Sequence, residues 1–265
     1  MPSYRVQIAV ILLITSLGLS LCSLVRADEP QQHSDRVQLG DDLEVEELAP
    51  GIWRHIFQIP LATGPFPANG LVITSADGAL VIDTPWTETQ TVRLLDWVEK
   101  DLGLTVEGVV ATHFHQDRLG GLAVVHRRGI TSYGNVKTAE LVDREAFEPP
   151  KELFRKRKTL RFGSRKIELF FPGAGHSPDN IVVWLPREKI LYGGCLLKSG
   201  SSRGLGFLGD ANLTHWPMAV RKVDRRYPKA NLVVPGHQEP DGRKAIENTL
   251  RLLTQKTQDA QNVQN

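Results

Sequence analysis

The chain has 265 residues, of which 41% are hydrophobic, and its 32 basic side chains nearly balance its 30 acidic ones. This composition excludes a disordered, collagenous or coiled-coil protein. The length is compatible with one large α/β domain or two small ones, and either can bury a substantial core.

The first 27 residues have the pattern of an export signal. Arg5 provides a positive start, residues 6–21 are almost continuously apolar, and Val-Arg-Ala at 25–27 offers small residues at a cleavage site. We therefore predict a signal peptide over residues 1–27 and a mature domain over 28–265 that resides in the periplasm. An uncleaved anchor is the alternative, because residues 6–25 have about the length of a membrane span.

Removal of this segment leaves a chain with balanced charge and one cysteine. Arg5 and Arg26 leave with the signal, so 30 basic side chains remain against 30 acidic ones. Balanced charge gives no general attraction to nucleic acid or to membrane surfaces, so we expect neither nucleic-acid binding nor stable membrane association. Because Cys22 is also removed, Cys195 is either buried and inert, paired between chains, or held as a thiolate by a metal.

Secondary structure follows from the spacing of apolar residues. Short apolar runs predict strands, and helical spacing predicts the helices between them. We expect strands over 51–59, 69–75, 78–83, 106–112, 159–162, 166–171, 180–185, 189–193 and 232–234, and helices over 87–102, 119–128, 136–146, about 212–226 and from about 242. Residues 28–42 form a polar lead-in, and the Gln- and Asn-rich tail from Thr254 should fray. This order suggests sheets with helices on their outer faces.

Residues 151–166 contain eight basic side chains and only one acidic one, Glu152. A nucleic-acid groove is conceivable for such a run. A solvated edge strand protected by charge fits the balanced mature chain better.

Metal-ligand residue types gather after the predicted strands. In an extended stretch, alternate side chains share a face, so His113, His115 and Asp117 should point together. His176, Cys195 and His237 each lie in or beside a Gly- or Pro-rich turn after another strand. A sheet can collect such strand ends at one edge and leave room for a substrate. The other four histidines, which we interpret as surface or packing residues, are His33, His55, His126 and His215.

With these motifs the sequence resembles the metallo-β-lactamases, in particular the subclass whose two zinc sites use three histidines and an Asp-Cys-His set. The resemblance covers nearly the whole mature chain and is carried by six motifs in the family's order, at residues 78–84, 113–118, 175–180, 193–198, 208–211 and 235–237. It implies an α/β protein of one domain, an αββα four-layer sandwich, with two zinc ions at the edge where the sheets meet.

The resemblance also implies roles for individual residues. His113, His115 and His176 would hold the first zinc, and Asp117, Cys195 and His237 the second. A zinc-bound hydroxide would hydrolyse the amide bond of β-lactam antibiotics without a serine nucleophile, and so confer resistance. We expect Asp117 and Lys198 to be catalytic residues. Lys198 resembles the family's lysine that binds the β-lactam carboxylate.

Supporting roles are expected for four more residues. Arg118 should pair with Asp117 or the thiolate, and Asp83 should support the metal loops or cap a turn. Residues 58–68 resemble the mobile hairpin that folds over substrate in this family, with Leu61 and Phe66 as substrate contacts or as packing residues. The prolines of this segment, at 60, 65 and 67, argue against regular strand pairing.

Two positions depart from the family pattern. Phe207 replaces a common asparagine and cannot donate a hydrogen bond to an oxyanion, and Gln238 replaces a glycine after the last histidine. These changes affect the expected substrate preference more than the reaction type. The alternatives are a lactonase, thioesterase or nuclease of the same fold, and a zinc-binding protein without catalysis. We expect a monomer whose partner is a small-molecule β-lactam.

Overall fold

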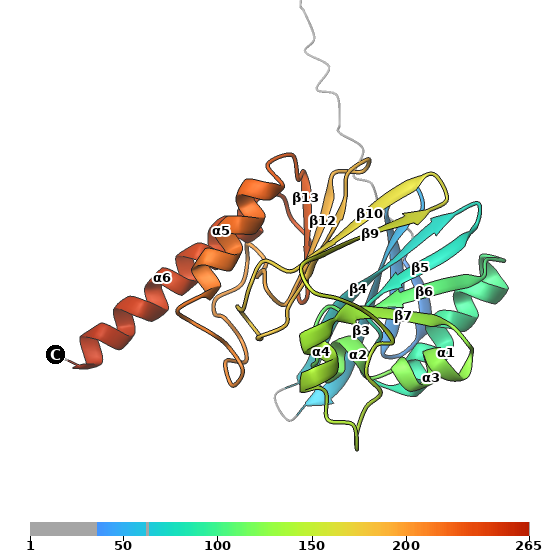
Figure 1. Cartoon of the computed structure of the whole chain (residues 1–265), viewed down its shortest axis with the longest axis horizontal. Helices are drawn as coiled ribbons and strands as arrows, with labels where there is room; N and C mark the ends of the chain where they lie inside the picture. The colour runs from blue at the N-terminus through green and yellow to red at the C-terminus, as the bar shows by residue number, and fades with distance from the viewer. Residues whose placement is uncertain (1–35, 62–63, 265) are drawn as a thin grey trace, which may run out of the picture. The chain divides into compact units, whose positions relative to one another are not determined.

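The computed structural model describes residues 36–61 and 64–264, with the side chains of 263 and 264 left out (Figure 1). The predicted signal peptide over residues 1–27 and His33 lie outside this part of the chain. Within the described residues, no helix combines the length and the apolar character that crossing a membrane requires.

Two sheets form the centre of the structure. The first has eight strands in chain order, antiparallel from β1 to β5 and parallel from β5 to β8. Its strands are β1 (Val37–Gly40), β2 (Leu43–Ala49), β3 (Ile52–Leu61), β4 (Gly64–Ser75), β5 (Gly78–Ile82), β6 (Val106–Val110), β7 (Thr131–Asn135) and β8 (Glu152–Phe154).

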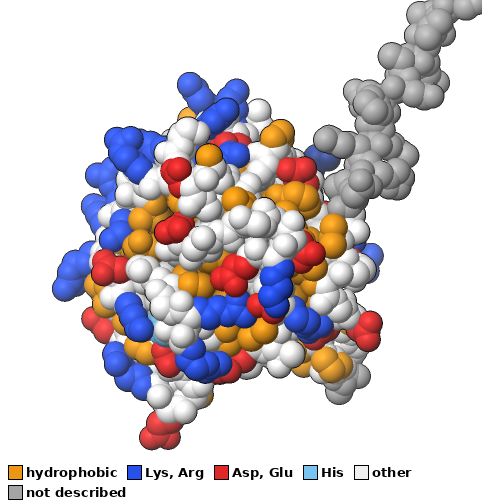
Figure 2. Space-filling model, turned by 90° about the vertical axis from the view of Figure 1, so that its right-hand side faces the viewer, with side chains coloured by type: hydrophobic (Ala, Val, Ile, Leu, Met, Phe, Trp, Pro, Cys, Tyr) orange, Lys and Arg blue, Asp and Glu red, His pale blue; other side chains and the backbone are white. Residues whose placement is uncertain are grey.

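The second sheet has five strands in the order β13-β12-β11-β10-β9, with one parallel pair between β12 and β13. Its strands are β9 (Arg157–Phe162), β10 (Arg165–Phe170), β11 (Val182–Leu185), β12 (Ile190–Gly194) and β13 (Leu232–Pro235). The basic run at 151–166 thus covers β8 and β9, which are edge strands of the two sheets, and this agrees with the predicted charged edge. Figure 2 shows Lys and Arg side chains gathered along the left-hand edge of one face.

Helices cover the outer face of each sheet (Figure 1). Beside the first sheet lie α1 (Glu88–Asp96), which continues as the π-helical turn η1 (Trp97–Asp101), and α3 (Leu122–Arg127). The short helices α2 (Gln116–Leu119) and α4 (Val136–Leu141) follow β6 and β7. The second sheet is covered by α5 (Trp216–Arg226) and α6 (Lys244–Gln264).

Three apolar clusters hold these layers together. One packs Val81 of β5 against Leu94 of α1, and a second packs Val233 of β13 against Val220 of α5. The third lies between the sheets and includes Leu71, Ile82, Ile167 and Val183, all of them fully buried. Helix, sheet, sheet and helix layers therefore follow one another, which confirms the predicted αββα sandwich.

The hairpin between β3 and β4 corrects one prediction. The ladder pairs Gln58 with Pro67 and Pro60 with Pro65, so the prolines do not prevent regular pairing. Pairing of β4 with β5 begins only at Leu71, so the first half of β4 has no strand on its other side. The prolines at 65 and 67, which lack a backbone N–H, therefore cost no hydrogen bond to β5.

Other differences concern the extent of elements. Strands β1, β2, β7 and β8 are additional to the prediction, and α4 ends at Leu141 rather than near 146. The C-terminal segment that we expected to fray continues α6 to Gln264.

Candidate metal centre

The six predicted ligand side chains meet at one end of the sandwich. His113 and His115 lie in the bend after β6, and Asp117 lies in α2. His176 follows β10, Cys195 follows β12 and His237 follows β13. The expected extended stretch over 113–117 is wrong, because α2 begins at Gln116 with His115 as its N-cap residue. One helical turn nevertheless brings Asp117 to the same place as the two imidazoles.

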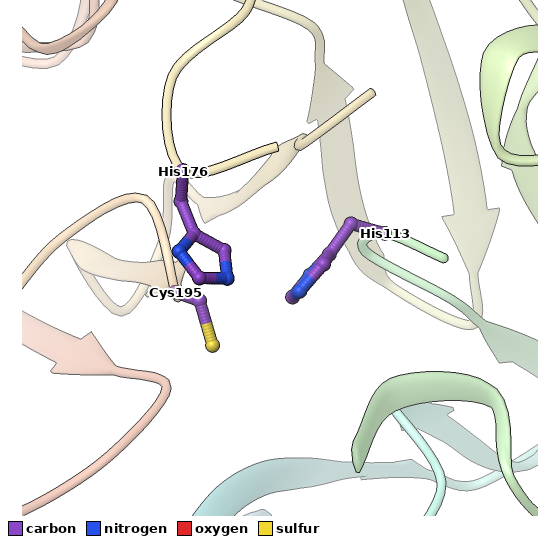
Figure 3. Close-up of side chains that lie close together, drawn as sticks. All are labelled: His113, His176 and Cys195. Carbon is purple, nitrogen blue, oxygen red and sulfur yellow. The ribbon is translucent and has the colours of Figure 1, made fainter. Parts of the chain in front are cut away.

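Three ring nitrogens converge on one point. Nε2 of His113 lies 3.0 Å from Nδ1 of His115, and Nε2 of His176 lies 3.2 Å from the same atom. Burial, reinforced by neighbouring positive groups, holds the pKa of His113 and of His176 well below its usual value. Both imidazoles are therefore neutral near pH 7, which is the form that binds metals. Figure 3 shows the rings of His113 and His176 directed toward the same space as the Cys195 sulfur.

An Asp-Cys-His group adjoins the three imidazoles. Oδ2 of Asp117 lies 3.8 Å from Sγ of Cys195 and 3.3 Å from Nε2 of His237. Burial lowers the pKa of His237, but the Cys195 thiolate and Asp117 outweigh it and raise this pKa to about 9. Nδ1 of His237 lies 2.8 Å from the carbonyl oxygen of Pro67, which fixes the ring and leaves Nε2 to face the other two ligands.

Arg118 is the buried cation of this centre. Its Nη2 donates to Oδ2 of Asp117 at 2.7 Å, to Sγ of Cys195 at 3.1 Å and to the carbonyl oxygen of Gly236 at 2.9 Å. Although burial opposes ionisation, Arg118 and then His237 hold the pKa of Asp117 well below its usual range. The expected alternatives, Asp117 or the thiolate, are thus both contacts of Arg118.

Asp83 lies behind Arg118 and is fully buried. It accepts hydrogen bonds from the backbone N–H of Thr112 at 2.7 Å and from the Tyr192 hydroxyl at 2.7 Å, and Nη1 of Arg118 lies 3.4 Å away. Burial raises the pKa of Asp83 to about 6, against the opposing effect of Arg118. Asp83 therefore connects the end of β5 to the residue before His113.

Asp210 contacts the site, although we predicted no role for it from the sequence. Its Oδ2 lies 2.9 Å from Nε2 of His115, so Nδ1 of His115 is the nitrogen that faces the other two rings. The Gly-Asp motif at 209–210 could have predicted this contact, because a carboxylate commonly orients a ligating histidine.

A pocket of about 430 Å³ opens onto the ligand cluster. Lys198, only 8% exposed, lines it, and burial lowers the pKa of its ammonium. Phe66 also lines it and lies 4.7 Å, centroid to centroid, from the His237 ring. Leu61 pairs with Gly64 at the hairpin end, is 45% exposed and does not line the pocket.

The two departures from the family pattern lie close to the cluster. Phe207 is 62% exposed and lines the pocket. Gln238 has a φ of 67°, a conformation that suits glycine, and its Oε1 accepts a hydrogen bond from the Ser202 hydroxyl at 2.5 Å. The backbone at 238 thus keeps the left-handed conformation although the residue is not glycine.

Two of the unassigned histidines have structural contacts. His55 is fully buried, with Nε2 lying 3.3 Å from the carbonyl oxygen of Ile82. His126 contacts the carboxylate of Glu148 and lies 2.7 Å from the Ser132 hydroxyl. His215, in contrast, is exposed at the start of α5 and makes no side-chain cap.

The chemistry of these donors fits zinc. A neutral imidazole offers one nitrogen with a free electron pair, and such nitrogens are common zinc ligands. Ligands about 2.05 Å from a tetrahedral zinc ion lie about 3.3 Å apart, close to the 3.0 and 3.2 Å found here. The ligand atoms also form overlapping groups of three within 4.8 Å, and Asp117 belongs to two of them.

The chain is similar to known proteins of one family over most of its length. The family model of the metallo-β-lactamase superfamily matches residues 63–237. The chain is 36% identical to a metallo-β-lactamase type 2 of Bacillus cereus, over 94% of this chain and 97% of that protein. It is 34% identical to a metallo-β-lactamase type 2 of Bacteroides fragilis, over 83% and 88% of the two chains. A solved metallo-β-lactamase from Pontibacter korlensis superposes with a TM-score of 0.78 at 37% identity, covering 80% of this chain and 99% of that one.

Proposed function

The chain belongs to the metallo-β-lactamase superfamily, and we propose that it uses two zinc ions to hydrolyse the amide bond of β-lactam antibiotics. The observation that carries this proposal is the adjacency of three imidazoles, whose nitrogens lie 3.0 and 3.2 Å apart, and an Asp-Cys-His group beside one open pocket. The pocket leaves space for a small molecule, and Lys198 in its wall provides a cation for an acidic one.

Each ligand group matches what zinc prefers. His113, His115 and His176 would hold one ion, and Asp117, Cys195 and His237 the other. Bound zinc polarises a carbonyl group and lowers the pKa of water, so that a nucleophile is available at neutral pH.

The protein's own residues position the reactants. Lys198 is placed to bind the substrate carboxylate, and Asp210 orients the His115 ring. The Asp117 carboxylate lies within 4.8 Å of ligand atoms of both His113 and His115 on one side and of Cys195 and His237 on the other, so it can accept a hydrogen bond or a proton from water held there. Phe66 and Trp86, whose ring centroids lie 6.1 Å apart, form an apolar part of the pocket wall beside His237.

A chromogenic cephalosporin tests the proposal. The purified, zinc-loaded protein should hydrolyse it, a chelator should abolish hydrolysis, and added zinc should restore it. A parallel panel of a lactone and a thioester separates the alternative hydrolases. Turnover of those compounds without turnover of the cephalosporin would contradict the proposal, and so would activity that persists after complete removal of metal.

Export to the periplasm is part of the same proposal. It is supported by the signal-like residues 1–27 and by the balanced charge of the remainder. Periplasmic extracts should contain a chain that begins at Asp28, as judged by its intact mass. A full-length chain in the membrane fraction would instead indicate the uncleaved anchor.

A further inference from the structure

Phe207 is exposed in a place where apolar side chains usually contact something. It is 62% exposed, more than the other exposed large hydrophobic side chains of the described residues. Its ring lies 5.6 Å from the ring of His115 at an interplanar angle of 75°, an edge-to-face contact with a metal-ligand residue. An exposed aromatic ring beside a reaction centre can supply a large apolar contact area to a ligand.

Two glycines hold this ring in position. Gly206 has a φ of 72°, which turns the chain into Phe207. A Cβ atom at Gly209 would lie 2.4 Å from Cζ of Phe207, so the ring rests directly on the bare backbone of that residue. A Cβ atom at Gly206 would lie 3.8 Å from Nζ of Lys198, so the same loop passes over the predicted carboxylate anchor. The direction of the ring therefore depends on residues 206 and 209.

The ring of Phe114, in the bend after β6, also contacts the His115 ring. Phe114 lies 4.6 Å from the His115 ring, also in an edge-to-face arrangement. Both rings line the pocket, as do Leu141 and Phe147, and the carboxylate of Asp143 lines it as well. The pocket thus has large apolar side chains that do not belong to the β3–β4 hairpin.

We infer that Phe207 is a specificity-determining residue, which with Phe114, Leu141 and Phe147 forms a subsite for an aromatic acyl side chain of the β-lactam. This inference rests on the proposed function. An acyl side chain is the variable, often apolar part of a penicillin, and the carboxylate is the constant, charged part. Lys198 suits the constant part, and a wall without hydrogen-bond donors suits the variable one.

A matched pair of penicillins tests the inference. Benzylpenicillin and 6-aminopenicillanic acid share the bicyclic nucleus and the carboxylate and differ by the phenylacetyl group. For Phe207→Ala, KM for benzylpenicillin should rise about fivefold to tenfold, as expected for the loss of one aromatic contact, while KM for 6-aminopenicillanic acid changes less than about twofold. Phe207→Leu should lie between wild type and Phe207→Ala.

Two further variants sharpen the test. Gly209→Ala keeps the phenylalanine but adds a methyl group where the ring rests. It should therefore raise KM for benzylpenicillin, though by less than Phe207→Ala does. Leu153→Ala is the control, because Leu153 on β8 is 42% exposed and lies outside the pocket lining; it should change neither KM.

Binding without turnover separates this inference from the proposed function. Calorimetry with the ring-opened products of the same two penicillins should show tighter binding of the phenylacetyl compound to the wild-type protein and loss of that preference in Phe207→Ala. Failure of the wild-type protein to hydrolyse either penicillin would contradict the proposed function. Hydrolysis of both, with equal effects of Phe207→Ala on the two substrates and the two products, would overturn the role of Phe207 alone.

Discussion

Nη2 of Arg118 lies 3.1 Å from Sγ of Cys195, and the same nitrogen donates to Asp117. One fully buried guanidinium therefore contacts two of the ligand side chains, while its other terminal nitrogen donates to the carbonyl oxygen of Asn69 at 2.6 Å and to the Tyr192 hydroxyl at 2.9 Å. A cation held this way positions the anionic ligands even before a metal binds.

Arg118→Lys should weaken the second zinc site by about 10- to 100-fold, because one ammonium cannot reach both sets of partners. The three-histidine site should keep its affinity. Competition with a chromogenic chelator measures both affinities. Arg127→Lys is the matched control, since Arg127 pairs with Glu88 at the surface. Equal zinc affinities in wild type and Arg118→Lys would contradict this role.

Lys198→Ala should mainly affect substrate binding. A charge-assisted hydrogen bond contributes about 1.5–3 kcal/mol, so KM for a carboxylate-bearing lactam should rise about 10-fold or more, with a smaller change in kcat. Steady-state kinetics provide the measurement, with Lys166→Ala on β10 as the control. A fall in kcat at unchanged KM would argue against carboxylate binding.

His55 should make folding sensitive to acid. Burial lowers the pKa of His55 to about 3, so the folded protein keeps it neutral while the unfolded chain binds a proton near pH 6.5. The contribution of neutral His55 to the free energy of unfolding is complete above pH 6.5. It is lost as the pH falls toward 3, and the loss is about 2 kcal/mol between pH 6.5 and 5. Urea denaturation of metal-free protein should show an acid loss in His55→Gln, which retains a donor for Ile82, that is smaller than the loss in wild type by this amount, because buried His113 and His176 affect both proteins equally. Parallel pH profiles of the two proteins would refute the assignment.

His126→Ala should destabilise the fold without a direct effect on the metal cluster. His126 on α3 joins Glu148, next to the pocket residue Phe147, to the buried hydroxyl of Ser132. Loss of a partner for that hydroxyl costs about 1–3 kcal/mol. Thermal denaturation should therefore show a lower melting temperature for His126→Ala than for His215→Ala, which removes an exposed ring. Equal stability of the two variants would contradict the difference.

The ligand set was predictable because its signal is local. His113, His115 and Asp117 alternate in the segment after β6, His176, Cys195 and His237 each follow a glycine, and the motif spacing carries the resemblance to the family. The path of the chain through Asp117 was not predictable in this way, because a helical turn and an extended segment both bring residues 113, 115 and 117 together.

Features that depend on distant contacts were not accessible from the sequence. The pairing of Pro60 with Pro65 depends on the free edge of β4, and the role of His126 depends on Ser132 and Glu148. The direction of Phe207 depends on the bare backbone of Gly209. Sheets with helices on their outer faces were predictable from the apolar runs, and the αββα order of the layers came from the resemblance to the family. Strands β1 and β2 were missed because they lie in a segment rich in acidic residues.

We propose that the two ligand groups bind two zinc ions and that Cys195 completes the second site. Native mass spectrometry of the zinc-loaded protein can count the bound ions in wild type and in Cys195→Ser, in which a hydroxyl, a poor zinc ligand, replaces the thiol. We expect two zinc ions in wild type and one in the variant, with the remaining ion held by His113, His115 and His176. Two ions bound equally tightly to Cys195→Ser, or fewer than two in wild type, would contradict it.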